Sequence, residues 1–166
     1  MIYLALGSNL AGDFANSAQL IGAAIDNVPL CGAHVVARAP LYRSTAVGPK
    51  VEGQAQGDYI NTVVGVRSVL PPFGLLRRLH ALEEAFGRER RVKWGPRTLD
   101  IDILSYHALV QGGLAQIPHP RLAARAFVLY PLRDIAPGWR HPISGAGVNA
   151  LINGLSAGER RSLSKL

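Results

Sequence analysis

Residues 94–104 have the sequence WGPRTLDIDIL, and this stretch carries the strongest structural signal in the chain. Its apolar residues Leu99, Ile101 and Ile103 alternate with polar ones, which is the period of a β-strand with one buried face. We therefore expect these three side chains to face a hydrophobic core. The rigid Trp-Gly-Pro-Arg lead-in before the strand is typical of a loop that ends where the strand begins.

Two aspartates occupy the other face of this predicted strand. Asp100 and Asp102 are two residues apart, so both carboxylates point the same way. Adjacent carboxylates repel each other, and a hard divalent cation such as Mg²⁺ is the simplest shared partner. The alternative interpretation is a solvated polar strand face, which is the usual role of an isolated Asp-x-Asp pair.

A dense group of cations precedes the aspartates and favours the metal interpretation. Between residues 77 and 97 the chain has seven cations against three acids. The cations are Arg77, Arg78, Arg88, Arg90, Arg91, Lys93 and Arg97. Because the net charge of +7 is concentrated here, we expect a bound polyphosphate anion rather than an extended nucleic-acid surface.

Composition indicates one globular domain over residues 1–166, with a core that needs no disulfide. The only cysteine is Cys31, which fits a reducing cytoplasm, and we expect a cytoplasmic, free-standing protein. No apolar run approaches the roughly 20 residues of a membrane span, and no signal peptide is evident at the N-terminus. We therefore expect neither a membrane nor a nucleic acid as partner.

The order of predicted elements indicates an α+β fold. Strands are predicted over 2–6, 34–42, 59–67 and 99–106, and helices over 13–28 and 71–87. Asp13 is the predicted N-cap of the first helix. The order β-α-β-β-α-β is that of a ferredoxin-like sandwich, with an antiparallel sheet covered by two helices on one face. A small hairpin over 110–115 and C-terminal helices near 126–135 and 148–155 follow, and 43–57 and 88–97 are predicted loops.

Several motifs in this chain resemble those of one enzyme family. They are YLALGSNL at 3–10, LYRST at 41–45, VGP at 47–49, DYIN at 58–61, WGPRTLDIDIL at 94–104, PHPR at 118–121 and RAFVL at 125–129. In this order they resemble the 6-hydroxymethyl-7,8-dihydropterin pyrophosphokinases of folate biosynthesis, over residues 2 to about 137. The resemblance implies transfer of pyrophosphate from ATP to the hydroxymethyl group of the dihydropterin, with release of AMP. It also implies a ferredoxin-like core whose two long loops close over the site.

The same resemblance assigns an ATP side to the site. It implies that Asp100 and Asp102 hold two Mg²⁺ ions, and that they act in catalysis with Arg88 and Arg97. The implied ATP-binding residues are His80, Glu83, Arg88, Arg90, Lys93, Trp94, Arg97, Ile103, His119, Arg121 and Arg125. Lys93 stands where the family usually has arginine, so the forked phosphate contact of a guanidinium is lost there.

The pterin side is assigned in the same way. The implied pterin-binding residues are Gly7, Ser44, Thr45, Val47, Tyr59, Asn61, Trp94 and Phe127. Tyr59 and Phe127 would sandwich the flat ring, and the Asn61 amide would hydrogen-bond its edge. The Ser44–Thr45 step lacks a proline that the family often has, and the stretch 50–57 is longer than in compact members. Both differences concern loop dynamics.

Three other functions remain open at this stage. A basic ferredoxin-like domain can bind RNA, but such domains use aromatic residues on central strands, and here only Tyr59 is available. A metal-dependent nuclease would account for the two aspartates and leave the pterin-side motifs unexplained. A catalytically inactive relative would not need the intact aspartate pair. We therefore expect a monomeric enzyme that binds ATP and 6-hydroxymethyl-7,8-dihydropterin.

Overall fold

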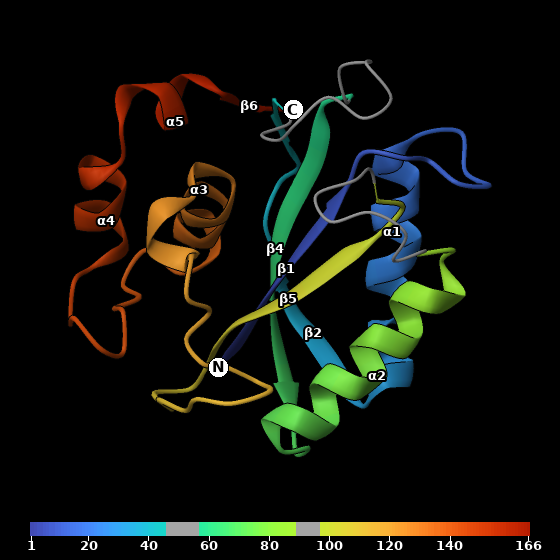
Figure 1. The fold of residues 1–166 in the computed structure, drawn as a ribbon, viewed down its shortest axis with the longest axis horizontal. Helices are drawn as coiled ribbons and strands as arrows, with labels where there is room; N and C mark the ends of the chain where they lie inside the picture. Colours follow the sequence, from blue (N-terminus) through green and yellow to red (C-terminus); the bar gives the residue numbers. More distant parts are fainter. Residues whose placement is uncertain (46–56, 89–96) are drawn as a thin grey trace.

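The computed structural model describes residues 1–45, 57–88 and 97–166 (Figure 1). The strands are β1 (Ile2–Ser8), β2 (Ala33–Arg38), β3 (Tyr42–Ser44), β4 (Tyr59–Ser68), β5 (Asp100–Tyr106) and β6 (Leu163–Lys165). The α-helices are α1 (Ser17–Asn27), α2 (Pro72–Ala85), α3 (Ala126–Ile135), α4 (Val148–Gly154) and α5 (Ala157–Arg161). Short 3-10 helices η1 (Val28–Cys31) and η2 (Leu122–Ala124) complete the described elements.

The strands form one antiparallel sheet in the order β5-β1-β4-β3-β6. The second half of β4 pairs with β2, so β2 and β3 lie along the same edge of β4. The strand predicted over 34–42 is therefore divided into two. The Thr62 hydroxyl donates to the carbonyl oxygen of Ala39 at 2.9 Å in the gap between them. The predicted β-α-β-β-α-β order is otherwise confirmed, with β2 and β3 together in the second strand position.

Helices cover both faces of the sheet (Figure 1). On one face α1 and α2 pack on apolar side chains of β1 and β5, including Leu4, Ile101 and Ile103. On the other face, α3 and α4 pack on the sheet in a second hydrophobic cluster, which includes Leu104 of β5 and Leu129 of α3. The sequence predicted the first layer. The second layer follows from the apolar positions of the C-terminal helices, which have no other surface to cover.

Strand β5 has the alternation that the sequence predicts as far as Ile103. Leu99, Ile101 and Ile103 are buried against α1 and α2, so Asp100 and Asp102 face the α3 side. The register then shifts, because Tyr3 pairs with Ser105 and Leu4 with Ile103. Because of this bulge, Leu104 packs in the second cluster, while Asp100 and Asp102 keep their orientation.

Three local predictions were wrong. Helix α1 begins at Ser17 with Asn16 as N-cap, because Asn16 Oδ1 accepts the amide N–H of Gln19 at 2.9 Å. The first strand, predicted to end at residue 6, continues through Gly7 and Ser8. The hairpin predicted over 110–115 is a single bridge between Gln111 and Ile117.

At the C-terminus the helix predicted near 148–155 is α4, and α3 has the predicted bounds. Helix α5 and strand β6 were not predicted, and β6 extends the sheet by pairing with β3. The predicted loops 43–57 and 88–97 lie largely outside the described residues. None of the helices in the described ranges has the length and apolar character required to cross a membrane.

Candidate active site

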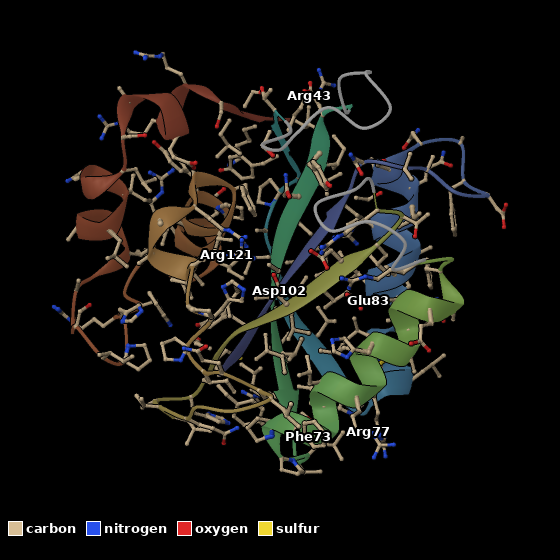
Figure 2. All side chains as sticks on the ribbon, in the orientation of Figure 1. Arg43, Phe73, Arg77, Glu83, Asp102 and Arg121 are labelled. Carbon is tan, nitrogen blue, oxygen red and sulfur yellow. The ribbon has the colours of Figure 1, made fainter. Side chains whose placement is uncertain are left out.

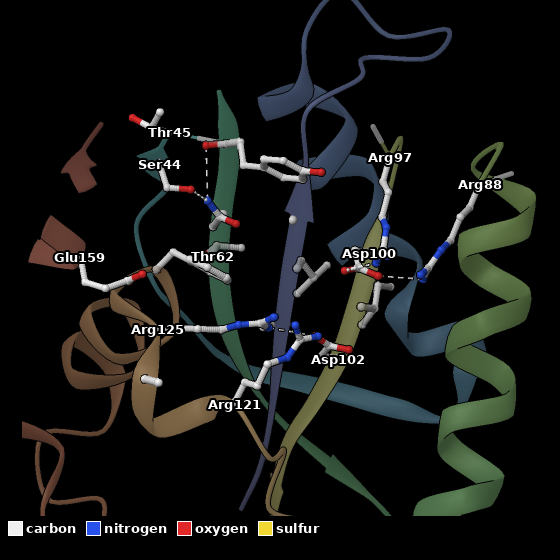
Figure 3. Close-up of a pocket in the computed structure, with 18 of the residues that line it drawn as sticks. Ser44, Thr45, Thr62, Arg88, Arg97, Asp100, Asp102, Arg121, Arg125 and Glu159 are labelled. Atoms are coloured by element: carbon white, nitrogen blue, oxygen red, sulfur yellow. Dashed lines mark hydrogen bonds and ion pairs between the residues drawn. The ribbon is translucent and has the colours of Figure 1, made fainter. Parts of the chain in front are cut away.

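A pocket of about 480 Å³ opens at the end of the sheet where β1, β4 and β5 meet the start of α3 (Figure 3). It brings together most of the predicted site residues that the structure describes. These are Gly7, Ser44, Thr45, Tyr59, Asn61, His80, Arg88, Arg97, Asp100, Asp102, Arg121, Arg125 and Phe127. Arg77 and Phe73, at the far end of α2, lie away from Asp102 and Arg121 (Figure 2). Val47, Arg90, Lys93 and Trp94 lie outside the described residues.

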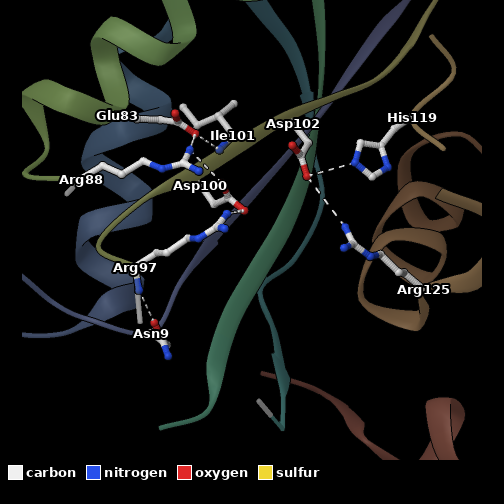
Figure 4. Close-up of polar contacts among 9 residues, drawn as sticks. All are labelled: Asn9, Glu83, Arg88, Arg97, Asp100, Ile101, Asp102, His119 and Arg125. Atoms are coloured by element: carbon white, nitrogen blue, oxygen red, sulfur yellow. Dashed lines mark hydrogen bonds and ion pairs between the residues drawn. The ribbon is translucent and has the colours of Figure 1, made fainter. Parts of the chain in front are cut away.

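Asp100 is paired with two arginines from the segments that flank the undescribed residues 89–96 (Figure 4). Arg97 Nη1 lies 2.7 Å from Oδ2 of Asp100, and Arg88 Nη1 lies 2.8 Å from Oδ1. A guanidinium on each oxygen neutralises this carboxylate and orients it. The Arg97 backbone is itself fixed, since its N–H donates to Asn9 Oδ1 at 2.8 Å.

Asp102 is held more loosely. Its Oδ2 lies 3.6 Å from His119 Nε2 and 3.8 Å from Arg125 Nη1, both beyond a strong hydrogen bond. His119 Nδ1 accepts the N–H of Arg121 at 3.2 Å, so in the neutral ring the proton is on Nε2 and faces Asp102. Burial lowers the pKa of His119, an effect that the nearby Asp102 carboxylate opposes.

The two carboxylates suit a Mg²⁺ site that is completed by a phosphate ligand. Side-chain exposures are 28% for Asp100 and 38% for Asp102, so both are accessible from the pocket. Among residues 1–45, 57–88 and 97–166, no three His, Cys, Asp or Glu side chains gather as a metal site. Mg²⁺ in nucleotide enzymes uses one or two carboxylates plus substrate phosphates and waters, and this donor set fits that pattern.

Glu83 lies behind this site rather than in it. Its side chain is 1% exposed, and Oε1 accepts the N–H of Ile101, between the two aspartates, at 2.6 Å. The same oxygen forms an ion pair with Arg88 Nη1 (Figure 4). Burial raises the pKa of Glu83 to about 7, although the Ile101 N–H and Arg88 act in the opposite direction. Glu83 thus links α2, β5 and Arg88, and its predicted contact with ATP stays a prediction.

Two other predicted ATP residues do not line the pocket. Ile103 is buried in the core under α1 and α2, so its side chain faces away from Asp102. His119 lies at the pocket margin with 15% of its side chain exposed. Their nucleotide contacts also stay predictions.

The predicted pterin residues form a polar frame at the other end of the pocket. Asn61 Nδ2 donates to Ser44 Oγ at 2.9 Å, and both side chains are buried. Gly7 lies opposite Asn61 in the β1–β4 register, and a Cβ at Gly7 would be 3.1 Å from Asn61 Oδ1. The Arg125 guanidinium lies 5.3 Å from the centre of the Phe127 ring. The frame therefore combines a fixed amide with an aromatic face.

Glu159, which no motif indicated as a site residue, also lines the pocket. Its Oε2 accepts the N–H of Ala126 at 3.1 Å, across 33 residues of chain. The Ser156-x-x-Glu159 spacing is that of a capping box, which could have indicated α5. It could not have indicated that the carboxylate caps another helix. Thr62 and Ala124 are further pocket residues without a sequence signal.

Comparisons with known proteins identify the family. A model of the 7,8-dihydro-6-hydroxymethylpterin-pyrophosphokinase (HPPK) family matches residues 3–137. A 2-amino-4-hydroxy-6-hydroxymethyldihydropteridine pyrophosphokinase of Synechocystis sp. is 44% identical over 149 residues, which cover 89% of this chain and 72% of the relative. The enzyme of that name from Pseudomonas aeruginosa is 43% identical, over 85% of this chain and 83% of the relative.

A solved structure supports the fold. The Plasmodium falciparum HPPK-DHPS structure with pterin and p-hydroxybenzoate has a TM-score of 0.72 and 15% identity, covering 99% of this chain. This chain spans 46% of that longer chain, so the likeness concerns one part of it. The family resemblance expected from the motifs is confirmed by the sequence comparisons. The chain therefore belongs to the 7,8-dihydro-6-hydroxymethylpterin pyrophosphokinase family, the ATP-dependent pyrophosphokinases of folate biosynthesis.

Proposed function

We propose that this pocket transfers the β,γ-diphosphoryl group of ATP to the hydroxymethyl oxygen of 6-hydroxymethyl-7,8-dihydropterin. The new bond joins that oxygen to the β-phosphorus, the bond from the β-phosphorus to the α,β-bridging oxygen breaks, and AMP leaves with that oxygen. The hydroxymethyl proton is released. One observation carries the proposal: a single pocket holds the aspartate pair with its arginines at one end and the Asn61–Ser44 frame with Phe127 at the other.

The ATP side needs positioning and charge neutralisation, which this end of the pocket supplies. Asp100 and Asp102 would hold two Mg²⁺ ions, which when bound neutralise phosphate charge and align the reacting oxygens. Arg88 and Arg97 already reach Asp100, and a phosphate beside it offers their guanidinium groups a second partner within a short movement. His119, Arg121 and Arg125 approach from the α3 side and would bind phosphate from that direction.

The pterin side needs a flat slot and a hydrogen-bonding edge. Tyr59 and Phe127 line the pocket and would stack on the two faces of the ring. Because the Asn61 amide nitrogen is occupied by Ser44, its oxygen is left to accept a pterin N–H. Gly7 leaves room for that oxygen. All residues named here come from one chain, so a monomer suffices for the proposed reaction.

The test measures AMP formation from ATP and Mg²⁺, with and without the dihydropterin, in wild type and Asp102→Asn. We expect pterin-dependent AMP release that falls by at least about a hundredfold in the variant, on the scale of losing a transition-state charge contact. Asp26→Asn, an exposed change on α1, is the matched control and should keep wild-type activity.

Different products would contradict different parts of the proposal. ADP in place of AMP would mean γ-phosphoryl transfer and a wrong bond assignment. Nucleotide hydrolysis that ignores the pterin would favour a hydrolase. Full activity in Asp102→Asn would remove the metal assignment while leaving the reaction intact.

A further inference from the structure

The C-terminal segment 156–165 lies outside the residues matched by the family model, yet it contacts the pterin end of the pocket. Strand β6 pairs with β3, placing Leu163 beside Ser44. The N–H of Thr45 donates to the carbonyl oxygen of Ser162 at 3.1 Å. The segment therefore holds the end of β3, from which Ser44 and Thr45 reach the pocket.

The same segment also reaches α3, through Glu159. Ser156 Oγ accepts the N–H of Glu159 at 3.1 Å, and Ser162 Oγ donates to its carbonyl oxygen at 2.8 Å. With its backbone fixed on both sides, Glu159 extends its carboxylate into the pocket (Figure 3). There Oε2 accepts the N–H of Ala126 at 3.1 Å.

Among the described residues, this contact supplies the side-chain cap that the N-cap residue of α3 does not provide. Ala126 is the first residue of α3, and Arg125 at the N-cap position makes no side-chain capping hydrogen bond. A carboxylate at a helix N-terminus is favoured by the helix dipole and by the free N–H groups there. Glu159 thus fixes the backbone between Arg125 and Phe127, both of which line the pocket.

We propose that Glu159 is a positioning residue for the pterin. By holding the Ala126 N–H it sets the start of α3, and therefore the Phe127 ring, relative to Ser44 and Thr45, which the same segment holds. The inference rests on the proposed function for the identity of the ligand. The role is specific to the site because α5 buries none of its residues and adds little to the core.

The two ends of the pocket should respond differently to loss of this contact. Glu159 forms its hydrogen bond with the start of α3, whereas Arg88 and Arg97 reach Asp100 from the opposite side of the pocket (Figure 3). For Glu159→Ala we expect the KM for the pterin to rise about tenfold, as for one lost charged hydrogen bond. The KM for ATP should rise by less than about threefold, because Arg125 is the one proposed phosphate ligand next to Ala126 and the pairs of Arg88 and Arg97 with Asp100 are unchanged.

Glu159→Gln keeps an oxygen that can accept the Ala126 N–H, so it should bring the pterin KM back to within about threefold of wild type. Arg161→Ala, an exposed change on the same helix, is the control and should match wild type. An unchanged pterin KM in Glu159→Ala would overturn the inference. So would an equal rise in both KM values, since that is the result of general loosening.

Amide hydrogen exchange of Ala126, measured without substrate, separates this inference from the proposed reaction. We expect slow exchange in wild type and Glu159→Gln and faster exchange confined to the start of α3 in Glu159→Ala. If wild type gave no pterin-dependent AMP, the proposed reaction would fail while this exchange experiment still tested the Glu159 contact. Unchanged Ala126 exchange in Glu159→Ala would overturn the positioning role whatever the activity.

Discussion

Arg97 Nη1 lies 2.7 Å from Oδ2 of Asp100, and Arg88 pairs with the other carboxylate oxygen, Oδ1. Within the described ranges, the ion-pair contacts of Asp102, two residues along β5, are 3.6 and 3.8 Å long. The two proposed metal ligands are therefore unequal before substrate arrives, with Asp100 occupied and Asp102 more open. A Mg²⁺ ion bound at Asp100 would compete with these two arginines, and ATP would relieve the competition because its phosphates offer the arginines another partner.

Arg97→Gln tests this competition. Without nucleotide, we expect the variant to bind Mn²⁺ about threefold to tenfold more tightly than wild type, because one positive charge beside Asp100 is removed. With ATP and pterin, turnover should fall at least about tenfold, because a phosphate contact is lost. Mn²⁺ titration followed by electron paramagnetic resonance measures the first effect, and AMP release measures the second.

The control for this prediction is Arg77→Gln, which removes the same charge from an exposed position at the far end of α2 (Figure 2). It should change neither quantity. Weaker Mn²⁺ binding in Arg97→Gln would mean that Arg97 orients Asp100 for the metal instead of competing with it.

Strand β5 shows what local sequence patterns can predict. The alternation of Leu99, Ile101 and Ile103 with the aspartates fixes which side chains are buried, because only one register satisfies a half-buried strand. The helix predicted near 126–135 also has the bounds of α3. Such predictions succeed because a half-buried strand has an apolar residue at every second position, and a half-buried helix has one at every third or fourth position.

Contacts between residues far apart in the chain produce no periodic pattern in the sequence. Glu83 accepts the N–H of Ile101 across 18 residues, and Glu159 accepts that of Ala126 across 33. Both are ordinary glutamates in sequence, and only the packing of α2 and α5 gives them their partners. The N-cap of α1 was also not predictable from residue type alone. Asp13 and Asn16 both precede the helix and both suit an N-cap, but it is Asn16 that accepts the N–H of Gln19.

Gly7→Ala tests whether space at Gly7 serves the pterin amide contact. The new Cβ would lie 3.1 Å from Asn61 Oδ1, which must then shift while Ser44 holds the amide nitrogen. We expect the pterin KM to rise about fivefold, equivalent to roughly 1 kcal/mol. The free energy of unfolding should change by less than about 1 kcal/mol, because alanine suits a strand at least as well as glycine.

Steady-state kinetics with each substrate varied measures this effect, and urea unfolding measures the stability. Gly112→Ala is the control, because nothing lies within 4 Å of a Cβ built there and its φ is not positive. If Gly7→Ala left the pterin KM unchanged, the Asn61 oxygen would not be the pterin contact.

Glu83 should make the stability of the protein depend on pH. Its pKa is about 7 in the folded protein, against an ordinary value of 4.5, with burial as the main cause. Between these values the folded state binds more protons than the unfolded state, so the free energy of unfolding falls as pH rises. The fall attributable to Glu83 is at most about 3 to 4 kcal/mol over this window, since one pH unit corresponds to about 1.4 kcal/mol. The contribution is fully present below pH 4.5 and lost above pH 7.

Glu83→Gln cannot titrate, so it isolates this contribution from that of every other group. Urea unfolding at pH 5, 6, 7 and 8 should show wild type losing stability relative to Glu83→Gln as pH rises, with the difference levelling off above pH 7. Glu84→Gln, exposed on the same helix, should run parallel to wild type. Parallel curves for wild type and Glu83→Gln would mean that the Arg88 ion pair and the Ile101 N–H keep Glu83 ionised throughout, and that these contacts offset the cost of burying its charge.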